Sequence, residues 1–225
     1  GKSTLARLLI GIEKPNSGTI TWNGEDITRW KASAWREKRR HIQAVFQDAS
    51  GTLNPARSVY HNVEEALRNL TQLDKRQRRA RIGELMELTH MDSHLLQVPV
   101  RQLSGGEQQM LAMGRALMSH PKILLMDEPT KGMDAEYKEE IGKILCKLKQ
   151  HGLTIFMISH DVEFVAEYAD RVGLFFEGNV VTSQNTREFF AGNNFYTTAA
   201  NRMARQLFPD AVTGKDVITC LRNSN

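Results

Sequence analysis

The sequence lacks several features that would assign it to a specialised class of protein. It has only two cysteines, Cys146 and Cys220, whose separation fits no metal-binding or redox motif and is typical of a protein from a reducing cytoplasm. No apolar run approaches the roughly 20 residues of a membrane-spanning helix. The longest candidates, such as Ile123–Met126, have the length of a strand. If the protein acts at a membrane, other chains are expected to cross it.

An excess of charge of one sign is also absent. Lysine and arginine total 30 against 26 acidic residues among 225, which gives a net charge of +4. This excess is too small to indicate a nucleic-acid-binding protein by itself. Hydrophobic residues make up 40% and charged residues 25%, as in an ordinary globular domain. The length suits one large domain or two small ones.

The spacing of apolar residues predicts helices that alternate with strands. Helical periodicity begins after Thr4, with one apolar stripe formed by Leu5, Leu8, Leu9 and Ile12. Residues 19–22, followed by Asn23-Gly24, predict a strand that enters a tight turn. Further on, the pattern predicts helices over 107–119, 135–150 and 161–168, and strands over 122–126, 153–158 and 171–176. Such alternation indicates an α/β fold with a mostly parallel sheet.

Residues 52–100 interrupt this alternation. They are polar, prone to form helices and almost free of glycine, and they contain the basic run Lys75–Arg81. We interpret them as a helical subdomain, over about 52–105, inserted into a single domain that covers residues 1–225. The tail from about residue 186 to 225 is predicted to be a helical, irregular extension. It is either a regulatory element or a packing and subunit-contact element, and the second interpretation is favoured.

The first four residues, Gly1-Lys2-Ser3-Thr4, match the end of the phosphate-binding loop G-x-x-x-x-G-K-[S/T]. In that loop a lysine binds β- and γ-phosphate oxygens and a hydroxyl binds Mg²⁺, roles that fit Lys2 and Ser3. The amphipathic helix that follows would present free N–H groups and the positive end of its dipole to an anion. A match of four residues can also arise by chance, so this motif requires the others.

Two consecutive carboxylates, Asp127 and Glu128, follow the apolar strand predicted at 122–126. Ligands of open α/β sheets bind at the carboxyl ends of the strands. Asp127 would therefore hold Mg²⁺, and Glu128 would orient and polarise the attacking water. A strand that simply reaches solvent at an Asp-Glu-Pro turn is the alternative interpretation.

The segment Leu103–Gln108, with the sequence LSGGEQ, predicts a helix that begins in serine and two glycines. Ser104, Gly105 and Gly106 would expose a hydroxyl and backbone N–H groups to an anion at the positive end of the helix dipole. A capping box between Ser104 and Glu107 is equally sound physically, and the two interpretations can coexist.

Three more residues occupy positions suited to nucleotide chemistry. Gln47 follows an apolar strand-like segment and would contact Mg²⁺ and the attacking water. His160 follows the strand predicted at 153–158 and would donate to a γ-phosphate, although a single histidine at a strand end is more often structural. Asp134 follows the paired carboxylates and would lie at a subunit interface.

In this order the motifs resemble the ATP-binding-cassette ATPases, the nucleotide-binding subunits of ABC transporters, and the resemblance covers nearly the whole chain. It implies a P-loop NTPase core with a partial antiparallel subdomain, ATP and Mg²⁺ as cofactors, and Ser3, Gln47 and Asp127 as metal ligands. It further implies that two cassettes, on separate subunits or fused in one chain, pair head to tail around shared ATP. One cassette contributes Lys2, Ser3, Gln47, Asp127, Glu128 and His160, and the other contributes Ser104, Gly105 and Gly106. ATP closes this dimer and hydrolysis opens it.

The resemblance also implies a location and a second partner. The chain is expected at the cytoplasmic face of a bacterial membrane, where the helical insert and the Gln47 loop dock against short helices of an integral membrane subunit. Residues 1–105, including Val45–Asp48 and Thr52–Arg57, resemble ATPases of oligopeptide and nickel importers. Residues from about 104, including Pro129–Asp134 and Asn194–Ala204, resemble energy-coupling-factor ATPases. The chain is thus either a natural mosaic or a fragment of a longer protein in which two cassettes are joined. Both resemblances favour the import of a small nutrient.

The sequence departs from the family pattern at its start. The glycine-rich first half of the phosphate loop, the strand before it and the aromatic residue that stacks on adenine have no counterpart ahead of Lys2. We therefore expect the polypeptide as given to bind ATP weakly.

Two alternative functions stay open at the level of sequence. A non-transport cassette ATPase that acts on nucleic acid or ribosomes would use the basic runs at 36–41 and 75–81, but acidic residues nearby favour a solvated face or a surface toward lipid head groups. A cassette retained only for docking is disfavoured by the presence of Lys2, Glu128 and His160.

Overall fold

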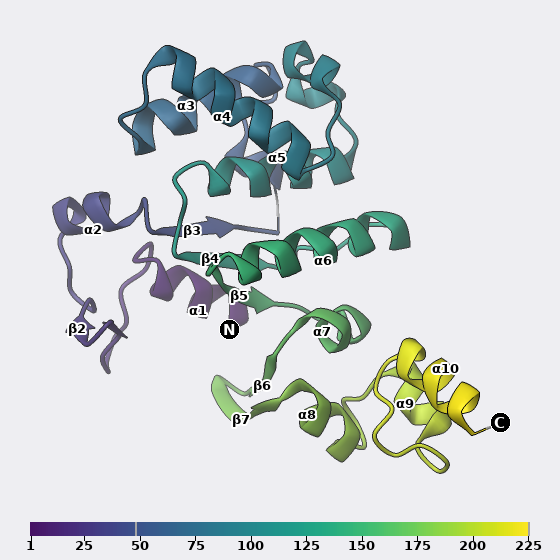
Figure 1. Ribbon diagram of the computed structural model, residues 1–225. Coiled ribbons are helices and arrows are strands. Elements are labelled where there is room, and N and C mark those ends of the chain that lie inside the picture. Colours follow the sequence, from purple (N-terminus) through teal and green to yellow (C-terminus); the bar gives the residue numbers. More distant parts are fainter. Residues whose placement is uncertain (48, 225) are drawn as a thin grey trace. The chain divides into compact units, whose positions relative to one another are not determined.

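The computed structural model describes residues 1–47 and 49–224 (Figure 1). Asp48, the last residue of the segment Val45–Asp48, therefore lies outside the described residues. The chain divides into a larger unit, residues 3–158, and a smaller unit, residues 1–2 with 159–225.

The larger unit is built on a sheet of three parallel strands: β3 (Ile42–Val45), β4 (Ile123–Asp127) and β5 (Thr154–Ile158). Their order is β3-β4-β5, and Val45 lies opposite Met126, which lies opposite Met157. The central strand β4 is almost wholly buried, as its apolar sequence requires. All three strands end at the same edge of the sheet. The predicted α/β class with a parallel sheet is confirmed.

Helix α1 (Lys2–Leu9) shows where the predicted apolar stripe was wrong. The helix ends at Leu9, so Ile12 lies beyond it and is 56% exposed. The residue that packs most deeply is Ala6, which is fully buried against Leu125 and Ile158 of the sheet. A small side chain allows the helix backbone to approach the strands closely, which a count of large apolar residues does not detect.

Helices connect these strands. Between β3 and β4 the chain forms η1 (Ala49–Thr52), α3 (Val59–Leu70), α4 (Lys75–Leu88), η2 (Ser93–Gln97), η3 (Val100–Gln102) and α5 (Gly105–Leu117), and α6 (Ala135–Gln150) precedes β5. Asp74 and Gln77 form a capping box that starts α4. Arg78, in the basic run at the start of α4, pairs with Glu64. Part of the positive charge of this run is therefore neutralised within the unit.

A small hairpin and helix precede β3. Strands β1 (Thr21–Trp22) and β2 (Glu25–Asp26) pair across Asn23-Gly24, whose φ angles of 51° and 81° fit a tight hairpin turn. Helix α2 (Ala32–Lys38) follows. Trp22, Trp30 and Trp35 stack edge to face in sequence, with ring centroids 6.5 and 5.5 Å apart. This aromatic cluster anchors the hairpin and α2 to each other.

The smaller unit contains the antiparallel pair β6 (Arg171–Phe176) and β7 (Asn179–Asn185). The strand predicted at 171–176 is therefore present, but its partner is β7 rather than a strand of the parallel sheet. The helices of this unit are α7 (Val162–Tyr168), α8 (Thr186–Gly192), α9 (Ala199–Ala204) and α10 (Gly214–Asn223). Phe189, Phe190 and Val212 form its buried core.

The histidine at position 120 predicts a dependence of stability on pH. Burial and, next, the positive charge of Arg81 lower the pKa of His120, because both disfavour the imidazolium form. The unfolded chain therefore binds a proton more readily, and the free energy of unfolding should fall as the pH drops below about 6.5. Urea unfolding at pH 7.5 and 5.5 measures this loss. His120→Asn should reduce it, since asparagine tolerates the φ of 49° at this position. An equal loss in both proteins would contradict the assignment.

Candidate functional site

The carboxyl edge of the parallel sheet carries the two consecutive acidic residues. Asp127 is the last residue of β4, is 4% exposed and lies opposite Ile158 of β5. Glu128 follows with a φ of 52°, and its backbone N–H donates to the Ile158 carbonyl at 2.8 Å. Positive φ is uncommon outside glycine and is found at sites where the surrounding structure dictates the backbone. The sheet edge therefore fixes the backbone that carries both carboxylates.

Gln47 and the start of α1 lie near the same edge. Gln47 comes two residues after Val45, whose neighbour across the sheet is Met126, and it is exposed. Ser3 and Thr4 are exposed in the first turn of α1, one turn before Ala6 packs on Leu125 and Ile158. In the larger unit, the structure thus brings Ser3, Gln47, Asp127 and Glu128 to one end of the sheet.

Two other predicted residues meet in the smaller unit. The Lys2 ammonium lies 2.7 Å from Nε2 of His160 and donates to it when that nitrogen is unprotonated. Gly1 lies against Phe175, whose ring carbon would be 3.1 Å from a Cβ at this position. The Lys2 ammonium and the His160 imidazole, which the sequence assigned to phosphate contact, are therefore adjacent although they are 158 residues apart in the chain.

The LSGGEQ segment forms the start of α5. Ser104 is the N-cap, and both its N–H and its hydroxyl donate to Oε2 of Glu107 at 2.7 Å, while the Glu107 N–H donates back to Ser104 Oγ at 3.2 Å. The predicted capping box is confirmed. Ser104 and Gly105 are nevertheless exposed, so the cap leaves the segment accessible. Asp134 is the N-cap of α6, and its carboxylate accepts from the Tyr137 N–H at 2.9 Å.

A contact that the sequence did not reveal connects these two helix starts. A Cβ on Gly106 would lie 3.0 Å from Cε1 of Tyr137, so the tyrosine ring packs directly on the Gly106 backbone. The sequence signals neither partner, because a tyrosine in the first turn of a helix is unremarkable without knowledge of what lies opposite.

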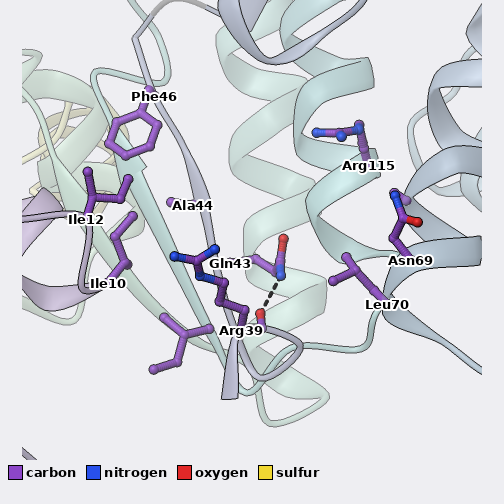
Figure 2. Close-up of a pocket in the computed structure, with 11 residues that line it drawn as sticks. Ile10, Ile12, Arg39, Gln43, Ala44, Phe46, Asn69, Leu70 and Arg115 are labelled. Atoms are coloured by element: carbon purple, nitrogen blue, oxygen red, sulfur yellow. Dashed lines mark hydrogen bonds between the residues drawn. The ribbon is translucent and has the colours of Figure 1, made fainter. Parts of the chain in front are cut away.

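A pocket of about 400 Å³ lies beside β3, and neither Asp127 nor Glu128 is among the residues that line it. Figure 2 shows Arg115 and Asn69 on one wall and Ile10, Ile12 and Phe46 on the other. The pocket is lined by Ile10, Ile12, Arg39, Ile42, Gln43, Ala44, Phe46, Ala66, Asn69, Leu70 and Arg115. These side chains include two guanidinium groups and no carboxylate. Sequence reasoning missed the pocket because its lining comes from four separate segments.

Comparison with known proteins identifies the family. The model of the ABC transporter family matches residues 1–131, and the chain belongs to that family as an ATP-binding cassette. The nickel import ATP-binding protein NikE of Shigella boydii is 36% identical over 185 residues, which cover 82% of this chain and 69% of NikE. A protein of Bacillus cereus whose name describes an ABC transporter ATP-binding protein is 35% identical over 99% of this chain.

Solved structures agree with this membership. CbiO1 of Clostridium perfringens, described as part of the ABC transporter complex cbiONQ, matches with a TM-score of 0.79 and 32% identity, over 99% of this chain and 83% of that one. The ATP-binding cassette MJ0796, a dimer bound to ADP and Pi, matches with a TM-score of 0.75 and 27% identity, over 83% of this chain and 81% of that one. The P-loop NTPase architecture is thereby confirmed.

The share of the relatives that the chain covers, and the length of its helices, are two further findings. The chain spans 39% of the length of the Bacillus relative. None of the helices in the described part of the chain is long and apolar enough to cross a bilayer.

Proposed function

We propose that this chain binds and hydrolyses ATP to power an ABC importer of a small nutrient: a vitamin, a metal ion or a peptide. The observation that carries the proposal is the position of Asp127 and Glu128 at the carboxyl edge of the sheet, near Gln47 and the start of α1. Names of relatives support import, because NikE is named for nickel import and CbiO1 is described as part of a transporter complex.

The donor set at the sheet edge fits magnesium. Ser3, Gln47 and Asp127 offer a hydroxyl, an amide and a carboxylate oxygen, which suit this hard cation. Among the described residues no group of three or more His, Cys, Asp or Glu is arranged to hold a metal. That agrees with an ion held through one carboxylate and the substrate phosphates. Bound Mg²⁺ would neutralise charge on the phosphates.

Individual residues of the chain have separate roles in ATP hydrolysis. Lys2, with Gly1 and Thr4 at the start of α1, binds phosphate oxygens, and the helix N-terminus adds N–H donors. Glu128 accepts a hydrogen bond from the attacking water and polarises it, while Gln47 orients it. His160 donates to the γ-phosphate, a role supported by its contact with Lys2, since both groups would face the same anion.

The second nucleotide contact comes from another cassette. Ser104, Gly105 and Gly106 bind the γ-phosphate held by the partner cassette, and Asp134 lies at the interface. The exposure of Ser104 and Gly105 supports this arrangement, because their anion would come from outside the chain. The dimeric state of MJ0796 supports it further. The partner is a second copy, a different cassette or a fused one, at the cytoplasmic face of the membrane.

The helical insert and the Gln47 loop are proposed to dock on a short helix of the membrane subunit. The pocket supports this, because it joins α3 to the strand that leads to Gln47 and its two arginines lack a carboxylate among the lining residues. An acidic side chain of the partner would complement them. Arg39→Glu should weaken binding to the solubilised membrane subunit at least about tenfold, whereas Arg36→Glu, outside the pocket lining, should leave it nearly unchanged. Equal effects in a surface-binding assay would contradict docking here.

The transport function is tested with the complete importer in proteoliposomes. ATP-dependent uptake should appear for one substrate among nickel, cobalt, a B vitamin and an oligopeptide, and Lys2→Ala should abolish it. ATP turnover that requires RNA or ribosomes, at a rate that does not depend on the membrane subunit, would contradict the proposal.

A further inference from the structure

The contact between Tyr137 and Gly106 joins the two helix starts that are proposed to face a second cassette. A Cβ on Gly106 would lie 3.0, 3.1 and 3.2 Å from Cε1, Cδ1 and Cγ of the ring. At these distances a side chain at position 106 would have to displace the ring, because the ring packs closely on the Gly106 backbone. A Cβ on neighbouring Gly105 would meet nothing within 4 Å. The ring therefore holds one glycine of the pair and leaves the other open to a ligand.

The backbone that carries Tyr137 is in turn tied to Glu128. The Lys131 N–H donates to the Glu128 carbonyl at 3.2 Å, and the Met133 N–H donates to the Thr130 carbonyl at 3.3 Å. These two turns lead to Asp134, whose carboxylate accepts from the Tyr137 N–H. Three local hydrogen-bonded turns thus follow one another along the chain, from Glu128 to the residue that packs on Gly106.

We propose that Tyr137 is a positioning residue that sets the Ser104–Gly106 backbone for the ATP of the partner cassette. The inference rests on the proposed function, in which Glu128 acts on one ATP and Ser104–Gly106 contacts another. Glycine loses more conformational freedom on ordering than any other residue, so two adjacent glycines in the first turn of α5 carry a high entropic cost of being held in one conformation. The tyrosine ring restricts Gly106 beforehand, and its attachment to the Glu128 turn ties the segment to the hydrolytic end of the same cassette.

ATP turnover by the assembled transporter, measured against ATP concentration, tests the role of the ring. Tyr137→Ala should raise KM for ATP about tenfold and change kcat less than about twofold, since ATP capture depends on the Ser104–Gly106 backbone while Glu128 is intact. Tyr137→Phe should keep KM within about twofold of the wild type, because the contacting atoms Cγ, Cδ1 and Cε1 are present in both rings. Glu136→Ala, at the exposed neighbouring position, is the matched control.

A purely structural role would have a different signature. Thermal unfolding of each variant is recorded, and Tyr137→Leu, which keeps apolar bulk without a ring, replaces the alanine variant if that one does not fold. Wild-type KM in both Tyr137→Ala and Tyr137→Leu, or a parallel loss of kcat and melting temperature without a rise in KM, would overturn the inference. Either result leaves the proposed function standing if Glu128→Gln abolishes turnover. Absence of turnover in the full-length wild-type protein, assembled with its membrane subunit, would instead refute the proposed function.

Discussion

Replacing Glu128 with glutamine is expected to lower the kcat for ATP hydrolysis about 10²–10⁴-fold, the range typical for loss of a positioned general base. Glutamine has nearly the same shape but cannot accept a proton from water. The φ of 52° and the hydrogen bond from the Glu128 N–H to Ile158 are backbone features, which the substitution leaves in place. ATP binding should therefore persist, with KM or Kd within about threefold of the wild type.

Phosphate release by the assembled transporter gives kcat, and equilibrium binding of a nucleotide gives Kd. Glu136→Gln provides the matched control, because it removes an exposed carboxylate from the first turn of α6 without touching the sheet edge. A Glu128→Gln variant that turns over ATP at the wild-type rate would show that another group activates water.

Gly11→Ala is expected to destabilise the larger unit by about 2–5 kcal/mol, the combined cost of a left-handed backbone and an overpacked core. Gly11 has a φ of 69°, and an added Cβ would lie 2.1 Å from Cε2 of Trp35. Trp35 is 6% exposed and packs with Ile27 and Ile42, so its ring cannot move without disturbing that cluster. Urea unfolding followed by tryptophan fluorescence measures the loss.

Gly18→Ala separates the two contributions to this loss. Gly18 has a φ of 84°, but a Cβ there would meet nothing within 4 Å. Only the backbone cost of about 1–2 kcal/mol should appear. Equal destabilisation by both substitutions would mean that the Trp35 ring moves aside at little cost.

Local signals were sufficient for much of the fold. Helix α6 begins and ends where the sequence predicts, because Asp134 is a good N-cap and the apolar periodicity continues to Gln150. Strand β4 was predictable because its short apolar run has the length of a buried strand and ends at two carboxylates. The Ser104 and Glu107 capping box follows from four consecutive residues. In each case the information lies within one element.

Features that depend on distant partners could not be predicted. The pairing of β6 with β7 depends on which strand edges meet, and periodicity carries no information about that. The burial of Ala6 depends on the close approach of α1 to the sheet. The contact between Tyr137 and Gly106 crosses 31 positions, and neither residue type is unusual where it stands. Sequence patterns predicted the chemical groups of the candidate site, and tertiary structure determined which of them are neighbours.

Complementation between two defective copies of the chain tests the shared nucleotide site most directly. In a head-to-tail dimer, Lys2→Ala disables one side of a site and Ser104→Arg disables the opposite side. Neither variant alone should hydrolyse ATP when assembled with the membrane subunit. Mixing the two before assembly should restore turnover, because half of the sites in a mixed dimer then combine an intact Lys2 with an intact Ser104. A mixture as inactive as its components would contradict ATP binding between two copies of this chain.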